Sequence, residues 1–328
     1  MKINIGFTSS DEYSNLLGVA MISILENNKD TKLCFYVIDY GISDSNKSLL
    51  KTQLKNYNNV ELIFIENNSD KLNKIDLNKS KNYEVYTYTR LILPSLLPDD
   101  VETILFLDCD IICSDSLRDL NKIDISEYYL GAVEESTNYI IKKNAYLSEE
   151  DQYFNAGVLL INLKKWREDK IEDVLLDFFY KNQPFYHAEQ DVLNYLFVDK
   201  IFKLDLKFNL TTWYHNPYYE SFFNFVGSQL AYSSKDVELA RKNPVFIHFN
   251  GGNLYRPWMN KHHPYRDLYE KYMSYSSFED FLISDNVSFK ARLYHLLITK
   301  YSYLFSKFIK PSYFLKSHEK RIKNFYKK

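Results

Sequence analysis

Short apolar runs alternate with longer segments of helical spacing through the first half of the chain. The runs Ile3–Phe7, Lys32–Ile38 and Val60–Ile65 have the length and the β-branched content of strands. Between them, Leu16–Asn27 and Ser45–Asn56 repeat apolar residues at helical spacing. Strands that alternate with helices in this way predict an α/β fold with a mostly parallel, doubly wound, twisted sheet flanked by helices.

A further apolar run begins at Thr103 and leads into two acidic residues, Asp108 and Asp110. We interpret it as a buried strand, preceded by a helix over Tyr86–Leu97. Side chains two residues apart on a strand point to the same side, so the two carboxylates should lie together at the strand end. Open α/β sheets bind ligands there. Because neighbouring carboxylates repel each other, a divalent cation that carries a phosphate ester is the natural partner. The alternative is that one Asp only caps a following helix, a role that Asp115 could also fill.

The second half of the chain is less regular, and its expected elements are fewer. These are a strand over Phe154–Asn162, a helix over Lys164–Asn182, a helix that begins at His187, a strand over Val245–Phe249 and a loop over Asn250–Asn253. From about Phe278 onward, aromatic residues are spaced as in amphipathic helices.

Composition excludes several classes of protein. The chain has 328 residues, 45% of them hydrophobic, and no apolar stretch long enough to span a membrane. We see no signal peptide at the N-terminus. The three cysteines, Cys34, Cys109 and Cys113, lack the spacing of a metal site. We therefore expect a cytoplasmic protein with reduced structural thiols.

The net charge of −2 conceals a strong asymmetry. From Lys290 to the end there are 11 Lys and Arg residues against one acid, Glu319, which leaves 30 basic and 42 acidic residues before it. Nothing else in the chain indicates nucleic-acid binding. This basic, aromatic tail could contact the anionic inner leaflet of a membrane, pack on the main domain with its charges solvated, or form a dimer.

Four motifs in order along the chain resemble glycosyltransferase family 8, whose members include bacterial lipopolysaccharide galactosyltransferases and glycogenin. They are Asp108-Cys-Asp110, Phe154-Asn-Ala-Gly-Val-Leu-Leu-Ile-Asn-Leu163, Glu189-Gln-Asp-Val-Leu-Asn194, and His248-Phe with Arg256-Pro-Trp258 downstream. The resemblance implies a GT-A fold, a Rossmann-like domain over residues 1–265 that binds a UDP-sugar and a metal. Residues 266–328 would then form a helical C-terminal extension.

The resemblance also implies a metal site. Asp108 and Asp110 match the metal-binding pair of the family, and His248 matches the third protein ligand. Two carboxylates with an imidazole suit Mn²⁺ better than Ca²⁺ or Mg²⁺, which prefer oxygen ligands alone, although Mg²⁺ remains an alternative. Taken singly, His248 would more simply be a core histidine. Gly251 beside it permits a close approach to phosphate.

Other matched positions imply a binding site for the UDP-sugar. The polar turn after the first strand matches the uridine contacts, at Thr8, Ser10, Asp11 and Tyr13. The family often has Asp at the position of Ser10 and Asn at that of Glu12, so some of the usual hydrogen bonds to uridine are missing here.

Further contacts to the donor are implied at Arg90, at Asp108 with its neighbour Cys109, and in the loop that carries Gly251. Arg256 takes the place of a lysine that is common in the family and comes two residues later. Taken alone, Arg90 would be a solvated helix residue or a structural ion pair. Both Arg and Lys can neutralise a leaving diphosphate, Arg through a planar fork.

The remaining matches surround the sugar. The small residues Asn155, Ala156 and Gly157 would border the donor sugar, and Glu189 stands where many relatives have Asp. Gln190 would face the reacting carbon, with Asp191 and Glu135 nearby. A neutral amide is a poor nucleophile, which favours a front-face displacement in which Gln190 stabilises positive charge. Asp191 could instead simply complement the helix dipole.

Together these matches imply a retaining hexosyltransferase. It would move galactose or glucose from a UDP-sugar to a glycan on lipid or protein, in the biosynthesis of bacterial surface polysaccharide or glycoprotein. The alternative is a non-catalytic homologue that binds a sugar nucleotide or glycan and supports another transferase. Self-glycosylation on tyrosine is a third possibility, although composition explains the 29 tyrosines more simply.

Overall fold

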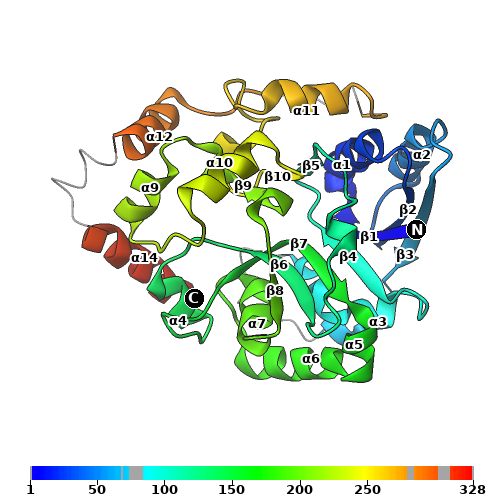
Figure 1. The fold of residues 1–328 in the computed structure, drawn as a ribbon, viewed down its shortest axis with the longest axis horizontal. Coiled ribbons are helices and arrows are strands. Elements are labelled where there is room, and N and C mark those ends of the chain that lie inside the picture. The colour runs from blue at the N-terminus through cyan, green and yellow to red at the C-terminus, as the bar shows by residue number, and fades with distance from the viewer. Residues whose placement is uncertain (1, 68, 74–83, 279–283, 302–310, 327–328) are drawn as a thin grey trace.

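The centre of the molecule is a seven-stranded sheet in the order β3-β2-β1-β4-β7-β6-β8 (Figure 1). The structure is a computed structural model, and it describes residues 2–67, 69–73, 84–278, 284–301 and 311–326. The strands of this sheet are β1 (Lys2–Ser10), β2 (Lys32–Tyr40), β3 (Val60–Glu66), β4 (Thr103–Leu107), β6 (Leu130–Glu134), β7 (Phe154–Asn162) and β8 (Ile201–Leu204).

Four of the six neighbouring strand pairs are parallel, and only β7 runs antiparallel to both of its neighbours. The helices α1 (Ser14–Asn27) and α2 (Asp44–Gln53) make the crossovers between the first three strands. Parallel neighbours require such crossovers, which explains the alternating pattern in the sequence. The predicted α/β class with a mostly parallel sheet is therefore confirmed.

Apolar residues cover both faces of the large sheet. In β2, Leu33, Phe35 and Val37 join one buried cluster, whereas Cys34 and Tyr36 join the other. A strand buried on both faces reads as a continuous apolar run rather than as an alternation. Two helical layers complete the clusters (Figure 1). One is formed by α1 and α11 (Arg266–Met273), and the other by α5 (Leu163–Glu168), α6 (Ile171–Asn182) and α7 (Ala188–Leu196).

A second, three-stranded sheet lies beside the first. It has the order β5 (Ile111–Cys113), β10 (Phe246–His248) and β9 (Leu210–Thr211). Asp108, Cys109 and Asp110 form the turn that leads from β4 of the large sheet into β5 of the small one. The two carboxylates are therefore brought together by this turn, rather than by the pleat of one strand as we expected.

Three expected elements differ from the structure. The helix predicted over Tyr86–Leu97 is a 3₁₀ helix (Val85–Ile92) followed by the short α3 (Leu93–Leu96). Pro94 explains the break, because it lacks the N–H that would continue a longer α-helix. The polar turn expected from Thr8 is instead the end of β1, followed by a 3₁₀ turn (Asp11–Tyr13). The helix expected over Lys164–Asn182 divides into α5 and α6 at Lys170, whose φ is +52°.

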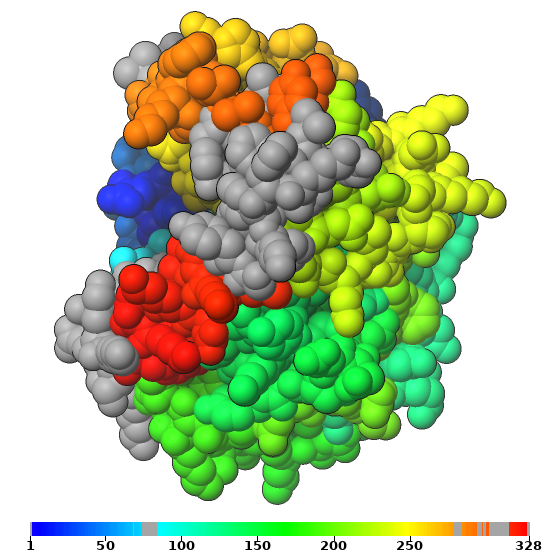
Figure 2. Space-filling model, turned by 90° about the vertical axis from the view of Figure 1, so that its left-hand side faces the viewer, coloured from blue at the N-terminus to red at the C-terminus, as the bar shows by residue number. Residues whose placement is uncertain are grey.

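The remaining helices gather around the small sheet and at the chain's C-terminal side. They are α4 (Tyr139–Asn144), α8 (Thr212–His215), α9 (Tyr219–Val226), α10 (Ser234–Lys242), α12 (Phe289–Lys300) and α14 (Pro311–Tyr326). In both views α14 lies beside α4, and in Figure 2 it covers part of the flank formed by the middle of the chain. Among the described residues, none of the helices combines the length and apolar composition that crossing a bilayer requires.

The packed body continues beyond residue 265. Tyr269 and Tyr272 of α11 are buried in the same core as α1, and Phe278 packs against Gly18. The expected tail helices are present as α12 and α14, and parts of the tail lie outside the described residues. Ile322 of α14 is buried, whereas Phe289 at the start of α12 is 79% exposed. The three cysteines are buried free thiols.

Candidate functional site

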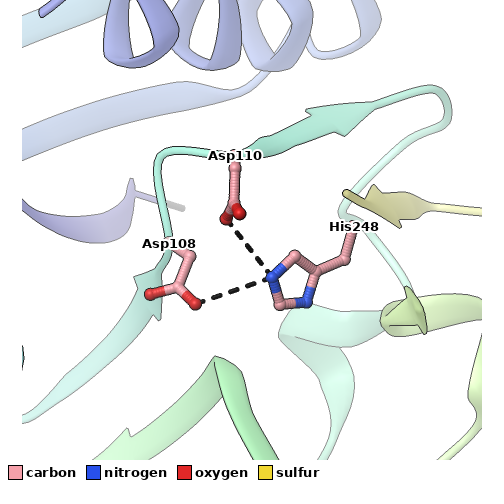
Figure 3. A group of neighbouring side chains, drawn as sticks. All are labelled: Asp108, Asp110 and His248. Carbon is pink, nitrogen blue, oxygen red and sulfur yellow. Dashed lines mark ion pairs between the residues drawn. The ribbon is translucent and has the colours of Figure 1, made fainter. Parts of the chain in front are cut away.

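Two carboxylates and one imidazole converge where the two sheets meet (Figure 3). Asp108 and Asp110 come from the turn after β4, and His248 ends β10. Nε2 of His248 lies 3.3 Å from Oδ1 of Asp110 and 3.6 Å from Oδ2 of Asp108, and one ligand atom from each residue falls within 4.8 Å of the others. Burial disfavours a charged imidazole, but the charges of Asp110 and Asp108 outweigh it and raise the pKa of His248. The same pairing with His248 outweighs burial to lower the pKa of Asp110.

A chain of hydrogen bonds determines which nitrogen of His248 carries a proton. The backbone N–H of Gly157 donates to Oδ1 of Asn155 (2.9 Å), and that oxygen also accepts from Nδ2 of Asn209 (2.8 Å). Oδ1 of Asn209 must therefore accept from Nδ1 of His248 (3.0 Å). Nδ1 therefore carries a proton whatever the charge of the ring, and Nε2 faces the two carboxylates. This arrangement is typical of histidines that bind metals through Nε2.

Gly157 is essential to the shape of this cluster. A Cβ atom at this position would lie 2.2 Å from Cε1 of His248 and 2.9 Å from Oδ2 of Asp108. We expected the small residue to make room for a ligand. The structure gives a more local reason, since no larger residue fits beside the imidazole.

Arg90 links this cluster to a second acidic group. The side chain is 7% exposed, and its guanidinium pairs with Asp108 and, at 2.6 Å, with Oε1 of Glu189. Glu189 is 4% exposed, and its Oε2 has no partner among the described residues. Burial raises the pKa of Glu189 to about 7, although Arg90 opposes the shift. Arg90 therefore forms buried ion pairs rather than lying solvated on a helix, and it reaches the site from a 3₁₀ helix.

These groups line a cavity of about 930 Å³. The sequence-predicted residues around it are Thr8, Ser10, Tyr13, Arg90, Asp108, Cys109, Asp110, Glu135, Asn155, Ala156, Gly157, Glu189, Gln190, His248, Gly251 and Arg256. They come from the ends of β1, β4 and β6, from the start of β7, from the two 3₁₀ helices (Asp11–Tyr13 and Val85–Ile92), from α7 and from the loop after β10. The carboxyl ends of parallel strands open into this space, as expected for a doubly wound sheet.

Two predicted residues lie outside the cavity lining. Asp11 accepts hydrogen bonds from the backbone N–H of Ser43 (2.8 Å) and from Nδ2 of Asn46 (2.7 Å), and it thereby ties the end of β1 to α2. Asp191 is 1% exposed and accepts from the Tyr153 hydroxyl (2.7 Å) and the backbone N–H of His187 (2.8 Å). The carboxylates of Asp11 and Asp191 therefore stabilise the elements around the cavity rather than facing into it.

Gln190 is held at both ends of its amide. Its Oε1 accepts from the backbone N–H of Ala156 (2.9 Å), and its Nε2 donates to the Tyr153 hydroxyl (3.0 Å) and to Oε2 of Glu135 (3.3 Å). Nδ2 of Asn155 donates to the same oxygen of Glu135 at 3.3 Å. The amide therefore has a defined direction in the cavity wall.

The loop after β10 brings a cation to the cavity. Gly251 has a φ of +113°, which an L-residue with a side chain rarely adopts, so glycine is required for the turn itself. Arg256 lies at the end of this loop, its guanidinium 5.9 Å from the ring centre of Trp258. Its charge contributes to the lowered pKa of Asp110.

Sequence reasoning missed several residues of the site. The cavity is also lined by Tyr86, His187, Trp213 and Asn250, and Asn209 and Tyr153 support it from behind. Tyr86 is the first residue of the helix predicted over Tyr86–Leu97, and its ring lies 6.1 Å from that of Tyr13. Asn209 and Trp213 flank β9, whose two residues are too few to give a sequence pattern.

Comparisons with known proteins identify a family for the chain. The sequence profile of glycosyl transferase family 8 matches residues 4–262. General stress protein A of Bacillus subtilis is 28% identical over 275 residues, which cover 82% of this chain and 92% of that protein. The lipopolysaccharide 1,3-galactosyltransferase of Salmonella typhimurium is 26% identical over 265 residues, covering 78% of this chain and 73% of the relative.

A solved structure is similar over nearly its whole length. The galactosyltransferase LgtC, crystallised with donor and acceptor sugar analogues, superposes with a TM-score of 0.68 at 26% identity. The match covers 88% of this chain and 99% of LgtC.

Proposed function

The chain belongs to glycosyl transferase family 8, as its four motifs predicted, and from this membership we propose that it is a retaining hexosyltransferase that uses a UDP-sugar and Mn²⁺. The donor sugar would be galactose or glucose, and the acceptor a glycan. The observation that carries the proposal is the Asp108–Asp110–His248 cluster in the wall of a 930 Å³ cavity. A cavity of that size can hold a nucleotide sugar.

The residues present fit a divalent metal. Asp108, Asp110 and His248 would hold it, because their ligand atoms already lie within 4.8 Å of one another and Nε2 is the nitrogen directed at the carboxylates. Two oxygen ligands with one imidazole suit Mn²⁺. When bound, the ion neutralises charge on the diphosphate and acts as a Lewis acid. Arg256 would supply a second positive charge at the same diphosphate.

We assign the uridine to the end of the cavity near β1. Tyr13 and Tyr86 offer aromatic faces and edges there, and Thr8 and Ser10 offer hydroxyls. Oγ1 of Thr8 is buried without a partner among the described residues, so it is available to a ligand. Asp11 would act indirectly, by fixing the end of β1 against α2.

We assign the sugar to the opposite end, near β7 and α7. Oε1 of Glu189 is held by Arg90, whereas its Oε2 has no partner in the described part of the chain, and we assign that oxygen to a hydroxyl of the sugar. Asn155 and Glu135 add further polar groups. Glu189 is one methylene longer than the Asp of many relatives, and we propose that this difference alters which donor sugar the site prefers.

The reaction we propose is a front-face displacement. The bond from the anomeric carbon to the UDP oxygen breaks with its electron pair on the diphosphate, and the acceptor hydroxyl oxygen forms its bond on the same face. The acceptor proton passes to the departing diphosphate. Gln190 stabilises the developing positive charge through the carbonyl oxygen of its amide, because preorganised dipoles act strongly in a site that excludes water.

The acceptor and the cellular setting remain proposals. Relatives named as lipopolysaccharide glucosyl- and galactosyltransferases support a role in bacterial surface polysaccharide or glycoprotein synthesis, with the glycan on lipid or protein. We propose a cytoplasmic enzyme whose basic tail contacts the inner membrane leaflet at its periphery. The exposed lysines of α14 support that contact.

The experiment that tests the function is release of UDP from a panel of UDP-sugars, with and without Mn²⁺. Asp110→Asn should abolish turnover while near-UV circular dichroism stays unchanged. Equal activity in excess EDTA would refute the metal dependence. A folded wild-type protein that binds a UDP-sugar but never releases UDP, with any acceptor glycan, would favour the non-catalytic homologue instead.

A further inference from the structure

The hydroxyl of Tyr153 lies at the centre of a buried polar cluster behind the cavity wall. The residue directly precedes β7 and is 1% exposed. Its oxygen lies 2.7 Å from Oδ1 of Asp191, 3.0 Å from Nε2 of Gln190 and 3.0 Å from Nδ1 of His187. Three polar groups thus share one oxygen that solvent does not reach.

The chemistry of these groups fixes the direction of each bond. A carboxylate only accepts, so the single proton of Tyr153 goes to Asp191. The phenol oxygen then accepts from the other two groups. Gln190 must present its NH₂ to Tyr153, and this agrees with its other partners, the accepting carboxylate of Glu135 and the donating N–H of Ala156.

We propose that Tyr153 is the positioning residue that holds the amide of Gln190 with its carbonyl oxygen on the reacting side. This inference rests on the proposed function, in which Gln190 stabilises positive charge. A flipped amide would turn its positive end toward that charge and oppose the reaction. Asp191 makes the arrangement directional, because it takes the proton that Tyr153 could otherwise give to Gln190.

The same cluster sets the tautomer of His187. Because the proton of Tyr153 is used by Asp191, Nδ1 of His187 must carry its own proton to make the 3.0 Å bond. The imidazole of His187 is itself part of the cavity lining. Tyr153 therefore orients two residues of the cavity wall, Gln190 and His187.

The ring of Tyr153 shares a buried apolar cluster with the C-terminal helix. It belongs to a buried cluster with Ile140 and Ile141 of α4 and with Ile322 of α14. Ile322 is 3% exposed. A residue far along the chain thus packs against the support of Gln190, which is consistent with α14 lying beside α4 in Figures 1 and 2.

A double-mutant cycle in the full-length chain tests the proposal. Tyr153→Phe should lower kcat for UDP-sugar turnover about tenfold or more while the donor KM changes less than about threefold, since misplacement of a group near the reacting centre affects the transition state most. In the Gln190→Ala background, Tyr153→Phe should change kcat less than about threefold, because the amide through which Tyr153 acts has been removed.

Tyr57→Phe is the matched control. Tyr57 also donates to a carboxylate, that of Glu26 at 2.6 Å, but lies away from the cavity lining. It should leave both kinetic constants unchanged. Ile322→Ala is the second variant, for the case that Tyr153→Phe does not fold. Ile322→Ala keeps the Tyr153 hydroxyl but loosens the packing of its ring. It should therefore lower kcat by a smaller factor than Tyr153→Phe does, and only when Gln190 is present.

A measurement without turnover separates this inference from the proposed function. The chain has five glutamines, so ¹⁵N-glutamine labelling gives few side-chain NH₂ signals, and Gln190→Ala identifies the one from Gln190. That signal should shift in Tyr153→Phe and stay in place in Tyr57→Phe. An unshifted signal, or equal effects of Tyr153→Phe with and without Gln190, overturns the positioning role. If the Gln190 signal shifts in Tyr153→Phe but the wild-type protein turns over no UDP-sugar, the positioning role is supported and the proposed function is refuted.

Discussion

A Cβ atom on Gly157 would lie 2.2 Å from Cε1 of His248, closer than two carbon atoms can approach without a bond. The backbone of β7 and the imidazole of β10 therefore touch, although they belong to different sheets. Gly157 also donates the hydrogen bond that begins the chain through Asn155 and Asn209 to His248. One glycine thus fixes both the position and the tautomer of the imidazole.

Gly157→Ala should displace His248 and weaken Mn²⁺ binding by about one to two orders of magnitude, as expected when a metal-binding histidine loses its support. Isothermal titration calorimetry with Mn²⁺ measures the effect. Gly252→Ala is the control, because a Cβ there meets nothing within 4 Å and should leave the affinity unchanged. An unaltered Kd in Gly157→Ala would show that the cluster does not bind the ion.

Asn209→Leu should also weaken Mn²⁺ binding, by roughly tenfold or more, while the fold persists. The variant removes the acceptor for Nδ1 of His248 and leaves a buried donor unpaired, so the imidazole loses its defined orientation. Electron paramagnetic resonance of free Mn²⁺ gives the bound fraction. A Kd equal to that of the wild type would mean that His248 is oriented by packing alone.

Transfer should proceed with retention, so an α-linked donor should give an α-linked product. The anomeric proton coupling in the NMR spectrum of the isolated product reports the linkage directly. A β-linked product would require an attack from the opposite face and would rule out the front-face displacement.

Protonation of two buried histidines, His215 and His263, should oppose folding at acidic pH. Burial lowers the pKa of His263 to about 4 and that of His215 to about 3, both below the value of about 6.5 expected in the unfolded chain. The unfolded state then binds more protons, and stability falls as the pH drops below about 6.5. From pH 7 to pH 5, His263 alone should cost roughly 2 kcal/mol of unfolding free energy. Urea denaturation at the two pH values should show a smaller loss for His263→Gln than for the wild type.

Deletion of residues 311–328 should lower both the melting temperature and kcat. It uncovers Ile140, Ile141 and Tyr153, which α14 shields through Ile322. The control keeps the helix and reverses its exposed charges with Lys316→Glu, Lys320→Glu and Lys323→Glu. That variant should retain activity yet bind anionic vesicles less than the wild type at low salt. A fully active, equally stable deletion would show that α14 serves only as an anchor.

Sequence patterns predicted those parts of the molecule that depend on local periodicity. The strands β1 and β2 are buried on one or both faces, β3 is half-buried along one face, and their apolar runs are visible without a structure. The residues Asp108 and Asp110 were identified by their place after such a run, although the reason for their convergence is a turn between two sheets. Pro94 lies inside the single helix predicted over Tyr86–Leu97, and a proline in a helix interior indicates the break that the structure has there.

Other features have no local signal. Asn209 bonds to His248, 39 positions away, and Tyr153 bonds to Asp191, 38 positions away. No local sequence pattern indicates such distant partners. The shared use of Arg90 by Asp108 and Glu189 likewise depends on how the 3₁₀ helix faces β4 and α7. These relationships follow from the tertiary arrangement alone.

The seam between the two sheets has a mechanical consequence. Asp108 follows a strand of the large sheet, whereas Asp110 and His248 flank strands of the small one. An ion bound by all three residues would link the two sheets, and movement of one sheet against the other would separate its ligands. Its binding free energy would then add to the cohesion of the molecule as a whole. Substitutions that shift one sheet against the other should therefore change the affinity for the ion as well as the stability of the fold.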